Sequence, residues 1–507
     1  MLGIKAKAIY NKKDKLDGSI LLIEKGEIVD IVRDTNTFSF PIIDYANCVI
    51  TPGFMDAHAH WGMTSLEATY TDLSSQTSLK GALSLIDNKV RTAPKEEILV
   101  FKNLRYSAFE EKRYPLKEEL DSVAPDHMIV VKDQTAHGCV LNSSGFDFFE
   151  KLGLTCTSNE FTTGLLTGSK SYDAMNLLDA YLVNNMDFEK AWLNTCNNAI
   201  KKGVTAAVVL EGALGNLEKA DLKDIEFYKN LCKKSPIDLT LFYQTMDVEA
   251  IVASGLDRIG GCILADGAFS PHTAALYEPY FDDPSTKGIL YISDEDMFDF
   301  VKKARENGLQ IAMHACGDAA IGQILEVYEK VFKDIPSRDH RCRIEHFEIP
   351  WKWQIEKALE LNVLPSMQPS FDYFWDMDVY EKLLGEERAR RKKPFKSLLD
   401  LGMHIPVGSD SPVTPIDPLL GIQSLVTNSN VNERVSIREA INLFTIESAY
   451  GVFKETEFGS FDKGMSANFV VLEEDPEMVD PQNIKDIAIL ETVIRGNSTT
   501  NYKNLHE

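Results

Sequence analysis

The chain has 507 residues, of which 44% are hydrophobic and 26% are charged, and this composition is typical of a globular protein with a large core. Acidic residues outnumber basic ones by 77 to 53, and the resulting net charge of −24 repels phosphate backbones and anionic lipid, so neither nucleic acid nor a membrane is an expected partner. The eight cysteines form no CxxC pair and no apolar run is long enough to span a bilayer, so we expect a reduced, cytoplasmic protein.

Short β-type runs occupy both ends of the chain. Residues 1–50 alternate such runs with turns, and Asp17-Gly18 is a typical turn signal. Residues 458–472 and 487–495 have the same character. We therefore predict that residues 1–50 and 456–507 build one composite β-sandwich around a central unit.

The segment 61–202 differs from the sequence on either side of it. It mixes helical patterns with irregular stretches, and about 140 residues is too long for a loop of a compact domain. We predict an inserted α/β subdomain between the first and second strands of the central unit.

From residue 203 onward, apolar β-type segments alternate with helical ones. The predicted strands are 204–210, 239–245, 261–266, 309–315, 342–347, 362–368 and 404–410, in addition to the strand that ends at His58. Several are apolar at both odd and even positions, as strands covered on both faces must be. These eight β/α units predict a TIM (β/α)8 barrel formed by residues 51–60 and 203–455, with its chemistry at the C-terminal strand ends. The basic run at 388–393 is interpreted as a solvated helix face.

Side chains of metal-ligating types gather at these predicted strand ends. His58 and His60 are two positions apart, so an extended segment presents both imidazoles on one face. Taken singly, each histidine could equally be a hydrogen-bonded core or loop residue. The set as a whole favours one metal centre, and its members are His58, His60, Cys262, His314, His346 and Asp410.

Eight segments in one fixed order carry a family resemblance over nearly the whole chain. They are TPGFMDAHAH, GVTAAVVLEG, ADGAFSPHTAAL, HACGDAA, IEHFEI, MQPS, VGSDSPVTPIDPL and FGSFDKGMSANFVVL. On these segments the chain resembles the amidohydrolase superfamily, in particular the YtcJ-like, amidohydrolase-3 branch that includes N-substituted formamide deformylases. The resemblance implies a metal-dependent hydrolase with a barrel, a composite β-sandwich and an inserted domain, and a homodimer. It assigns His58, His60 and Asp410 to the more exposed metal, and His314 and His346 to a second one.

Cys262 departs from the pattern of this branch. The family usually has a lysine there, which is expected to be carboxylated and to bridge two metals. A thiolate could bridge two ions in its place, or the side chain could be a buried, inert thiol beside a single ion. We expect one or two divalent ions per chain, with zinc as the expected metal and Cys262 among the ligands.

The expected reaction is hydrolysis of a non-peptide carbon–nitrogen bond of amide type in a small molecule by a metal-activated water. Asp410 is expected both to ligate the metal and to carry the proton. The resemblance places His137 toward the substrate, although Thr135 replaces the usual aspartate nearby. Asp266 and Gln368 either contact substrate or stabilise loops. The alternatives are ester, carbamate or deaminating hydrolysis at the same site, and an inactive metal-binding scaffold.

Overall fold

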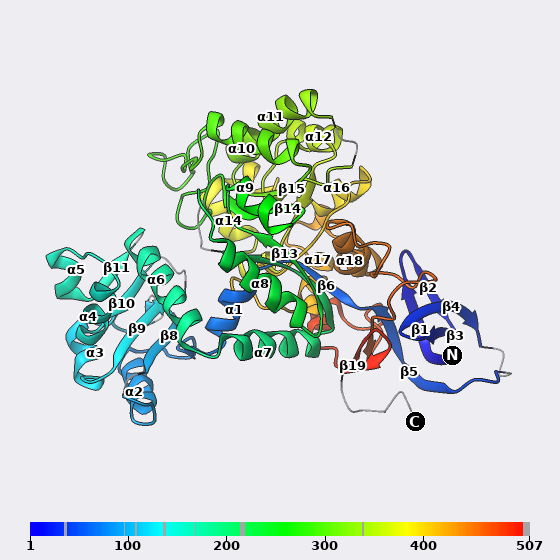
Figure 1. Ribbon diagram of the computed structural model, residues 1–507, viewed down its shortest axis with the longest axis horizontal. Coiled ribbons are helices and arrows are strands. Elements are labelled where there is room, and N and C mark those ends of the chain that lie inside the picture. Colours follow the sequence, from blue (N-terminus) through cyan, green and yellow to red (C-terminus); the bar gives the residue numbers. More distant parts are fainter. Residues whose placement is uncertain are drawn as a thin grey trace. The chain divides into compact units, whose positions relative to one another are not determined.

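The computed structural model describes residues 1–34, 38–95, 97–106, 109–134, 138–167, 169–212, 218–336 and 339–499. The chain divides into two compact units (Figure 1). Unit 1 comprises Met1–Trp61 and Thr195–Glu507, and unit 2 comprises Gly62–Asn194. Unit 2 is slightly shorter than the predicted insertion at 61–202.

Strands from both ends of the chain form one sheet in unit 1, where Figure 1 shows the blue strands β1 to β5 near the red strand β19. Its order is β20 (Asn497–Ser498), β19 (Ile489–Ile494), β18 (Phe469–Leu472), β5 (Ile42–Pro52), β1 (Leu2–Asn11), β3 (Ser19–Glu24) and β4 (Glu27–Arg33), with β2 (Asp14–Asp17) paired to β1. Strand β18 pairs antiparallel with β5. Ile4, Ile50, Phe469 and Val471 belong to the core beneath it. Strands from both ends of the chain thus share one hydrogen-bonded sheet, and the composite β-sandwich stays a prediction.

Buried parallel strands form the centre of unit 1. One sheet contains β13 (Asp238–Tyr243), β12 (Val204–Glu211) and β6 (Phe54–Ala59), and the other contains β14 (Arg258–Leu264), β15 (Gln310–Ala315), β16 (Arg343–His346) and β17 (Leu364–Ser366). The side chains of β6, β12, β15 and β16 are buried on both faces. β12 and β15 are accordingly apolar at most positions, whereas β16 carries Arg343, Glu345 and His346.

The eighth predicted strand, 404–410, is not a regular strand. Val407 bridges Met367 and Ser411 bridges Ala59, both in parallel, so this segment connects the two sheets. Among the described residues no strand pairing joins β13 to β14. The structure thus confirms a mixed α/β fold with parallel strands, and the closed barrel remains a prediction.

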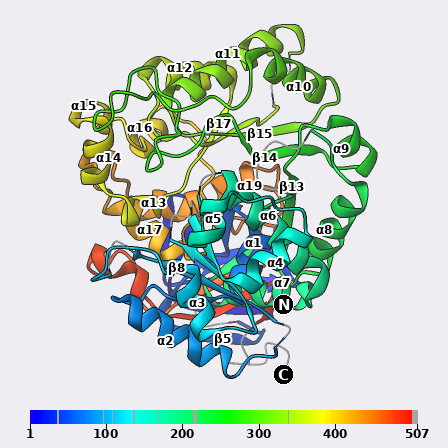
Figure 2. The ribbon, with the colours of Figure 1, turned by 90° about the vertical axis from the view of Figure 1, so that its left-hand side faces the viewer.

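Helices alternate with these strands, and in Figure 2 the helices α8 to α12 and α14 lie in an arc outside β13, β14, β15 and β17. They are α8 (Leu222–Lys234), α9 (Val248–Ser254), α10 (Asp294–Glu306), α11 (Asp318–Asp334), α12 (Lys352–Leu361), α13 (Phe371–Phe374), α14 (Met377–Leu384), α15 (Glu386–Ala389), α16 (Phe395–Asp400), α17 (Pro418–Val426), α18 (Ile437–Asn442) and α19 (Ser448–Tyr450). In α10, Ser293 caps the N-terminus and Lys303 and Arg305 lie in the last turn, as the helix dipole favours. No described helix has both the length and the apolar character needed to cross a membrane.

Unit 2 has its own sheet and core. The sheet order is β11 (Leu165–Thr167), β10 (Gly138–Leu141), β9 (Met128–Asp133), β8 (Ile98–Leu104) and β7 (Thr71–Asp72). Its helices are α2 (Leu79–Val90), α3 (Lys117–Val123), α4 (Ser143–Lys151), α5 (Ser158–Thr163) and α6 (Ser169–Asn185), while α1 (Trp61–Glu67) and α7 (Phe188–Lys201) cross the unit boundaries. Phe101, Leu120 and Val131 are fully buried in this core.

Candidate metal centre

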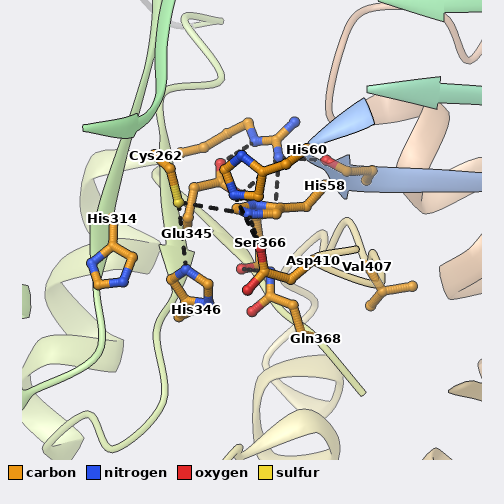
Figure 3. Close-up of polar contacts among 12 residues, drawn as sticks. His58, His60, Cys262, His314, Glu345, His346, Ser366, Gln368, Val407 and Asp410 are labelled. Carbon is orange, nitrogen blue, oxygen red and sulfur yellow. Dashed lines mark hydrogen bonds and ion pairs between the residues drawn. The ribbon is translucent and has the colours of Figure 1, made fainter. Parts of the chain in front are cut away.

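The six predicted ligands lie together at the ends of the parallel strands of unit 1 (Figure 3). His58 is in β6 and His60 follows it, Cys262, His314 and His346 lie in β14, β15 and β16, and Asp410 lies in the connecting segment. None of the six is more than 7% exposed. The fold therefore gathers side chains that are up to several hundred positions apart in the sequence.

Their ligand atoms form three overlapping groups with mutual distances of at most 4.8 Å: His58, His60 and Asp410; His58, Cys262 and His346; His314, Cys316 and His346. Asp410 Oδ1 lies 3.1 Å from His58 Nε2 and 3.2 Å from His60 Nε2. Cys262 Sγ lies 3.7 Å from His58 Nε2 and 3.8 Å from His346 Nε2. Tetrahedral zinc, with bonds of about 2.0–2.3 Å, places adjacent ligand atoms about 3.5 Å apart, so these spacings suit a cation.

Glu345 and Arg343 fix the orientation of His58. Glu345 Oε2 accepts a hydrogen bond of 2.6 Å from His58 Nδ1, which leaves His58 Nε2 facing Asp410 and Cys262. Arg343 lies 2.7 Å from the other Glu345 oxygen and donates to Ser366 Oγ at 2.8 Å. Burial raises the pKa of Glu345, but Arg343 and His58 outweigh it and lower the pKa to about 2. The sequence analysis did not single out Arg343 and Glu345. Two opposite charges inside a predicted buried strand would have indicated them.

Buried anionic groups dominate the electrostatics of the centre. Burial lowers the pKa of His58, yet Asp410, Cys262 and Glu345 together hold that pKa well above its ordinary value. Burial raises the pKa values of Cys262 and Asp410, yet the neighbouring histidines keep both well below the usual range. A bound cation would take the place of protons on these imidazoles, so cations and protons compete for the site.

Two buried polar atoms at the centre lack a hydrogen-bond partner within the part of the chain that the structure describes. They are His346 Nδ1 and Gln368 Oε1. Buried polar atoms are normally paired, so such atoms indicate a missing ligand. Imidazole, thiolate and carboxylate are also the ligand types of zinc, so the residues present fit a divalent ion.

Two of the ligand positions have an unusual backbone conformation. Asp410 has a φ of 57° and His346 a φ of 75°, both in the left-handed region that non-glycine residues rarely adopt. Such conformations persist where the surrounding structure enforces them, and they are concentrated at functional sites.

The predicted substrate-binding residues have different surroundings. Asp266 accepts hydrogen bonds from the backbone N–H groups of Ala275, Cys316 and Gly317, so both its oxygens hold loops in place. Gln368 donates to Ser366 O at 3.4 Å, and its Oε1 atom has no partner among the residues that the structure describes. Figure 3 shows the side chain beside Asp410. His137 lies outside the described residues.

Histidine, thiol and carboxylate groups converging at the ends of buried parallel strands define a class of metal-dependent hydrolases. The chain belongs to the amidohydrolase family, whose family model matches residues 41–500. This match confirms the family predicted from the sequence.

Similar proteins support this assignment. YtcJ of Bacillus subtilis (strain 168), named as an amidohydrolase, is 29% identical over 490 residues, which cover 90% of this chain and 89% of that protein. The N-substituted formamide deformylase of Arthrobacter pascens is 25% identical over 491 residues, covering 90% and 89% of the two chains. The crystal structure of a metal-dependent hydrolase from Pyrococcus furiosus superposes with a TM-score of 0.76 at 22% identity, covering 94% of this chain and 99% of that one. At this identity the likeness shows the fold alone.

Proposed function

We propose that this protein hydrolyses a non-peptide carbon–nitrogen bond of amide type in a small molecule, using one or two zinc ions. The proposal depends above all on the group of His58, His60 and Asp410, whose buried ligand atoms all lie within 4.8 Å of one another. Membership of the amidohydrolase family supports hydrolysis. The name of the Arthrobacter pascens relative supports an amide-type substrate.

The ligands divide between two sites in this proposal. His58, His60 and Asp410 would hold one ion, and His314 and His346 the other, with Cys262 between them. A bound divalent ion supplies Lewis acidity, which activates water as a nucleophile at neutral pH and polarises the scissile carbonyl.

Asp410 carries the proton in the proposed reaction. Its carboxylate accepts a proton from the attacking water and returns it to the leaving nitrogen. Glu345 keeps His58 in the tautomer that presents Nε2 to the ion. Because the unpaired atom of Gln368 is an acceptor, it suits an N–H group of the substrate.

Three further expectations belong to the proposal. Eight parallel segments and the fold shared with the Pyrococcus furiosus hydrolase support a closed (β/α)8 barrel. Eight free cysteines support action in the cytoplasm. His137 is expected to contact the substrate.

Metal analysis and an activity screen test the proposal together. Zinc per chain is measured for wild type, Cys262→Ala and Cys342→Ala, a matched control because Cys342 is fully buried but belongs to none of the three groups. We expect two ions in wild type and control and one in Cys262→Ala. The screen covers formamides, N-acyl amines, lactams, esters and carbamates. Failure to retain metal, or turnover of esters alone, would contradict the proposal.

A further inference from the structure

A second thiol, that of Cys316, lies beside His314 and His346. Cys316 directly follows β15 and is 3% exposed. Its Sγ atom lies 3.6 Å from His314 Nε2 and 3.6 Å from Glu348 Oε1. Nitrogen atoms of His314 and His346 and this sulfur all lie within 4.8 Å of one another.

We propose that Cys316 is a thiolate ligand of the second ion, together with His314 and His346. This inference rests on the proposed metal centre and extends it, because Cys316 was not among the expected ligands. On binding, the S–H bond breaks, a sulfur–metal bond forms, and the proton passes to solvent. Glu348 Oε1 accepts the hydrogen bond of the Cys316 thiol at 3.6 Å and holds the sulfur in position.

The distances between the sulfur of Cys316 and its neighbours suit a metal ion. Zinc–sulfur bonds of about 2.3 Å and zinc–nitrogen bonds of about 2.0 Å give a tetrahedral edge of about 3.5 Å. The sulfur of Cys316 is 3.6 Å from His314 Nε2, and a nitrogen of His346 lies within 4.8 Å of both atoms, so an ion fits among the three ligands after a small movement of the side chains.

The charges around Cys316 also favour a cation. Glu348 is 3% exposed, and its carboxylate accepts hydrogen bonds from the Tyr380 hydroxyl and the Cys316 thiol, which are both neutral donors. His314 Nδ1 lies 3.3 Å from Asp266 Oδ1, which leaves His314 Nε2, 3.6 Å from the sulfur, to face an ion. Buried Lys393 already interacts electrostatically with the Glu348 carboxylate. A cation beside Cys316 would add to that charge compensation and engage the imidazoles.

Two thiols make this centre selective for a class of metals. Cys262 lies beside His346 and Cys316 lies beside His314, so the second site combines sulfur with imidazole. Such sites favour zinc and cobalt over magnesium and manganese, which prefer oxygen ligands.

The test uses cobalt as a spectroscopic probe of the full-length apoprotein. Thiolate bound to Co²⁺ gives a ligand-to-metal charge-transfer band, so titration reports sulfur coordination independently of activity. The decisive protein is Cys262→Ser, in which any remaining sulfur band has to come from another thiol. We expect that band to persist in Cys262→Ser and to disappear in Cys262→Ser/Cys316→Ser. Cys342→Ser, a buried thiol outside the centre, should titrate like wild type.

Zinc binding gives the matching affinity measurement. Loss of Cys316 as a ligand should weaken binding of the second zinc by at least about ten-fold in Cys316→Ser. Should the serine variants fail to fold, zinc-edge X-ray absorption of the wild-type holoenzyme and of Glu348→Gln counts the sulfur neighbours instead. Absence of a sulfur band in folded, metal-loaded Cys262→Ser would overturn the inference. A sulfur band that persists in a protein hydrolysing none of the screened substrates would refute the proposed function and leave the inference standing.

Discussion

Gly408 lies where the connecting segment passes closest to β6. A Cβ atom at this position would lie 2.3 Å from the backbone nitrogen of His58 and 2.7 Å from Asp56 Oδ1. Backbone atoms cannot give way as flexible side chains do, so the segment carrying Asp410 or the strand carrying His58 would have to move.

Gly408→Ala should therefore separate the ligands of the first ion. We expect zinc content to fall by at least one ion per chain and the melting temperature to fall, since overpacking costs about 1–3 kcal/mol. Gly81→Ala in α2 is the control, because its nearest neighbour is the end of the flexible Gln76 side chain. Full zinc content in Gly408→Ala would show that the site tolerates the displacement.

Asp410→Asn separates metal binding from proton transfer. The amide keeps the size of the side chain and one oxygen ligand, so zinc content should stay near wild type. Turnover should fall by about 10²–10⁴-fold, because the amide cannot accept the proton of the attacking water. Steady-state kinetics on the best substrate of the screen measures this change, and near-normal turnover with full zinc would exclude the role.

The sequence identified these residues because ligand types stood at the ends of predicted strands. It did not identify Cys316, although the spacing of His314 and Cys316 repeats that of His58 and His60. It also misjudged the basic run at 388–393, since Lys392 and Lys393 are 0% and 1% exposed. Lys392 donates to Asp372 at 2.6 Å, a pairing between distant segments that no local pattern reveals.

At the scale of elements, the strands β12 and β15 were predicted well because both their faces are buried and most of their positions are apolar. The segment 404–410 was harder, since it makes only isolated bridges to Met367 and Ala59. The pairing of β18 with β5 joins residues more than 400 positions apart, and only similar composition at the two ends of the chain hinted at it.

His340 connects the approach to β16 with the end of α12. Its Nδ1 atom accepts from the backbone N–H of Cys342 at 2.9 Å, and Nε2 donates to Leu361 O at 2.8 Å. Burial lowers the pKa of His340 to about 4, because an imidazolium in this position would be poorly solvated. In the unfolded chain the same group titrates near its ordinary value.

The free energy of unfolding should therefore fall as the pH is lowered from about 6.5 to about 4. Between about pH 6.5 and pH 4 the unfolded chain binds the proton and the folded one does not, which costs up to about 3 kcal/mol. Urea midpoints across the window should decline less steeply in His340→Gln than in wild type, although the variant is less stable at neutral pH. Equal slopes would mean that His340 titrates normally in the folded protein.

At the scale of the whole molecule, the terminal sheet is part of unit 1 and shares its stability. Val471 in β18 is fully buried in the core of this sheet, whereas the nearby Glu473 is exposed. Val471→Asp would place a carboxylate without a partner in that core.

We expect Val471→Asp to yield little soluble, folded protein, since burial of an unpaired charge is among the costliest substitutions. Glu473→Lys, two positions away, should behave like wild type. Soluble yield and limited proteolysis measure both variants. Normal yield and zinc content in Val471→Asp would mean that the sheet is dispensable for the metal centre.

The pairing of β5 with β18 also has a consequence for biosynthesis. A ribosome has to add more than 400 residues after β5 before its neighbour β18 emerges. Until then the nascent chain carries a long strand with an open edge, a state prone to aggregation. Slow translation or a shortage of chaperones should therefore affect this protein more than one whose sheets are completed by consecutive strands.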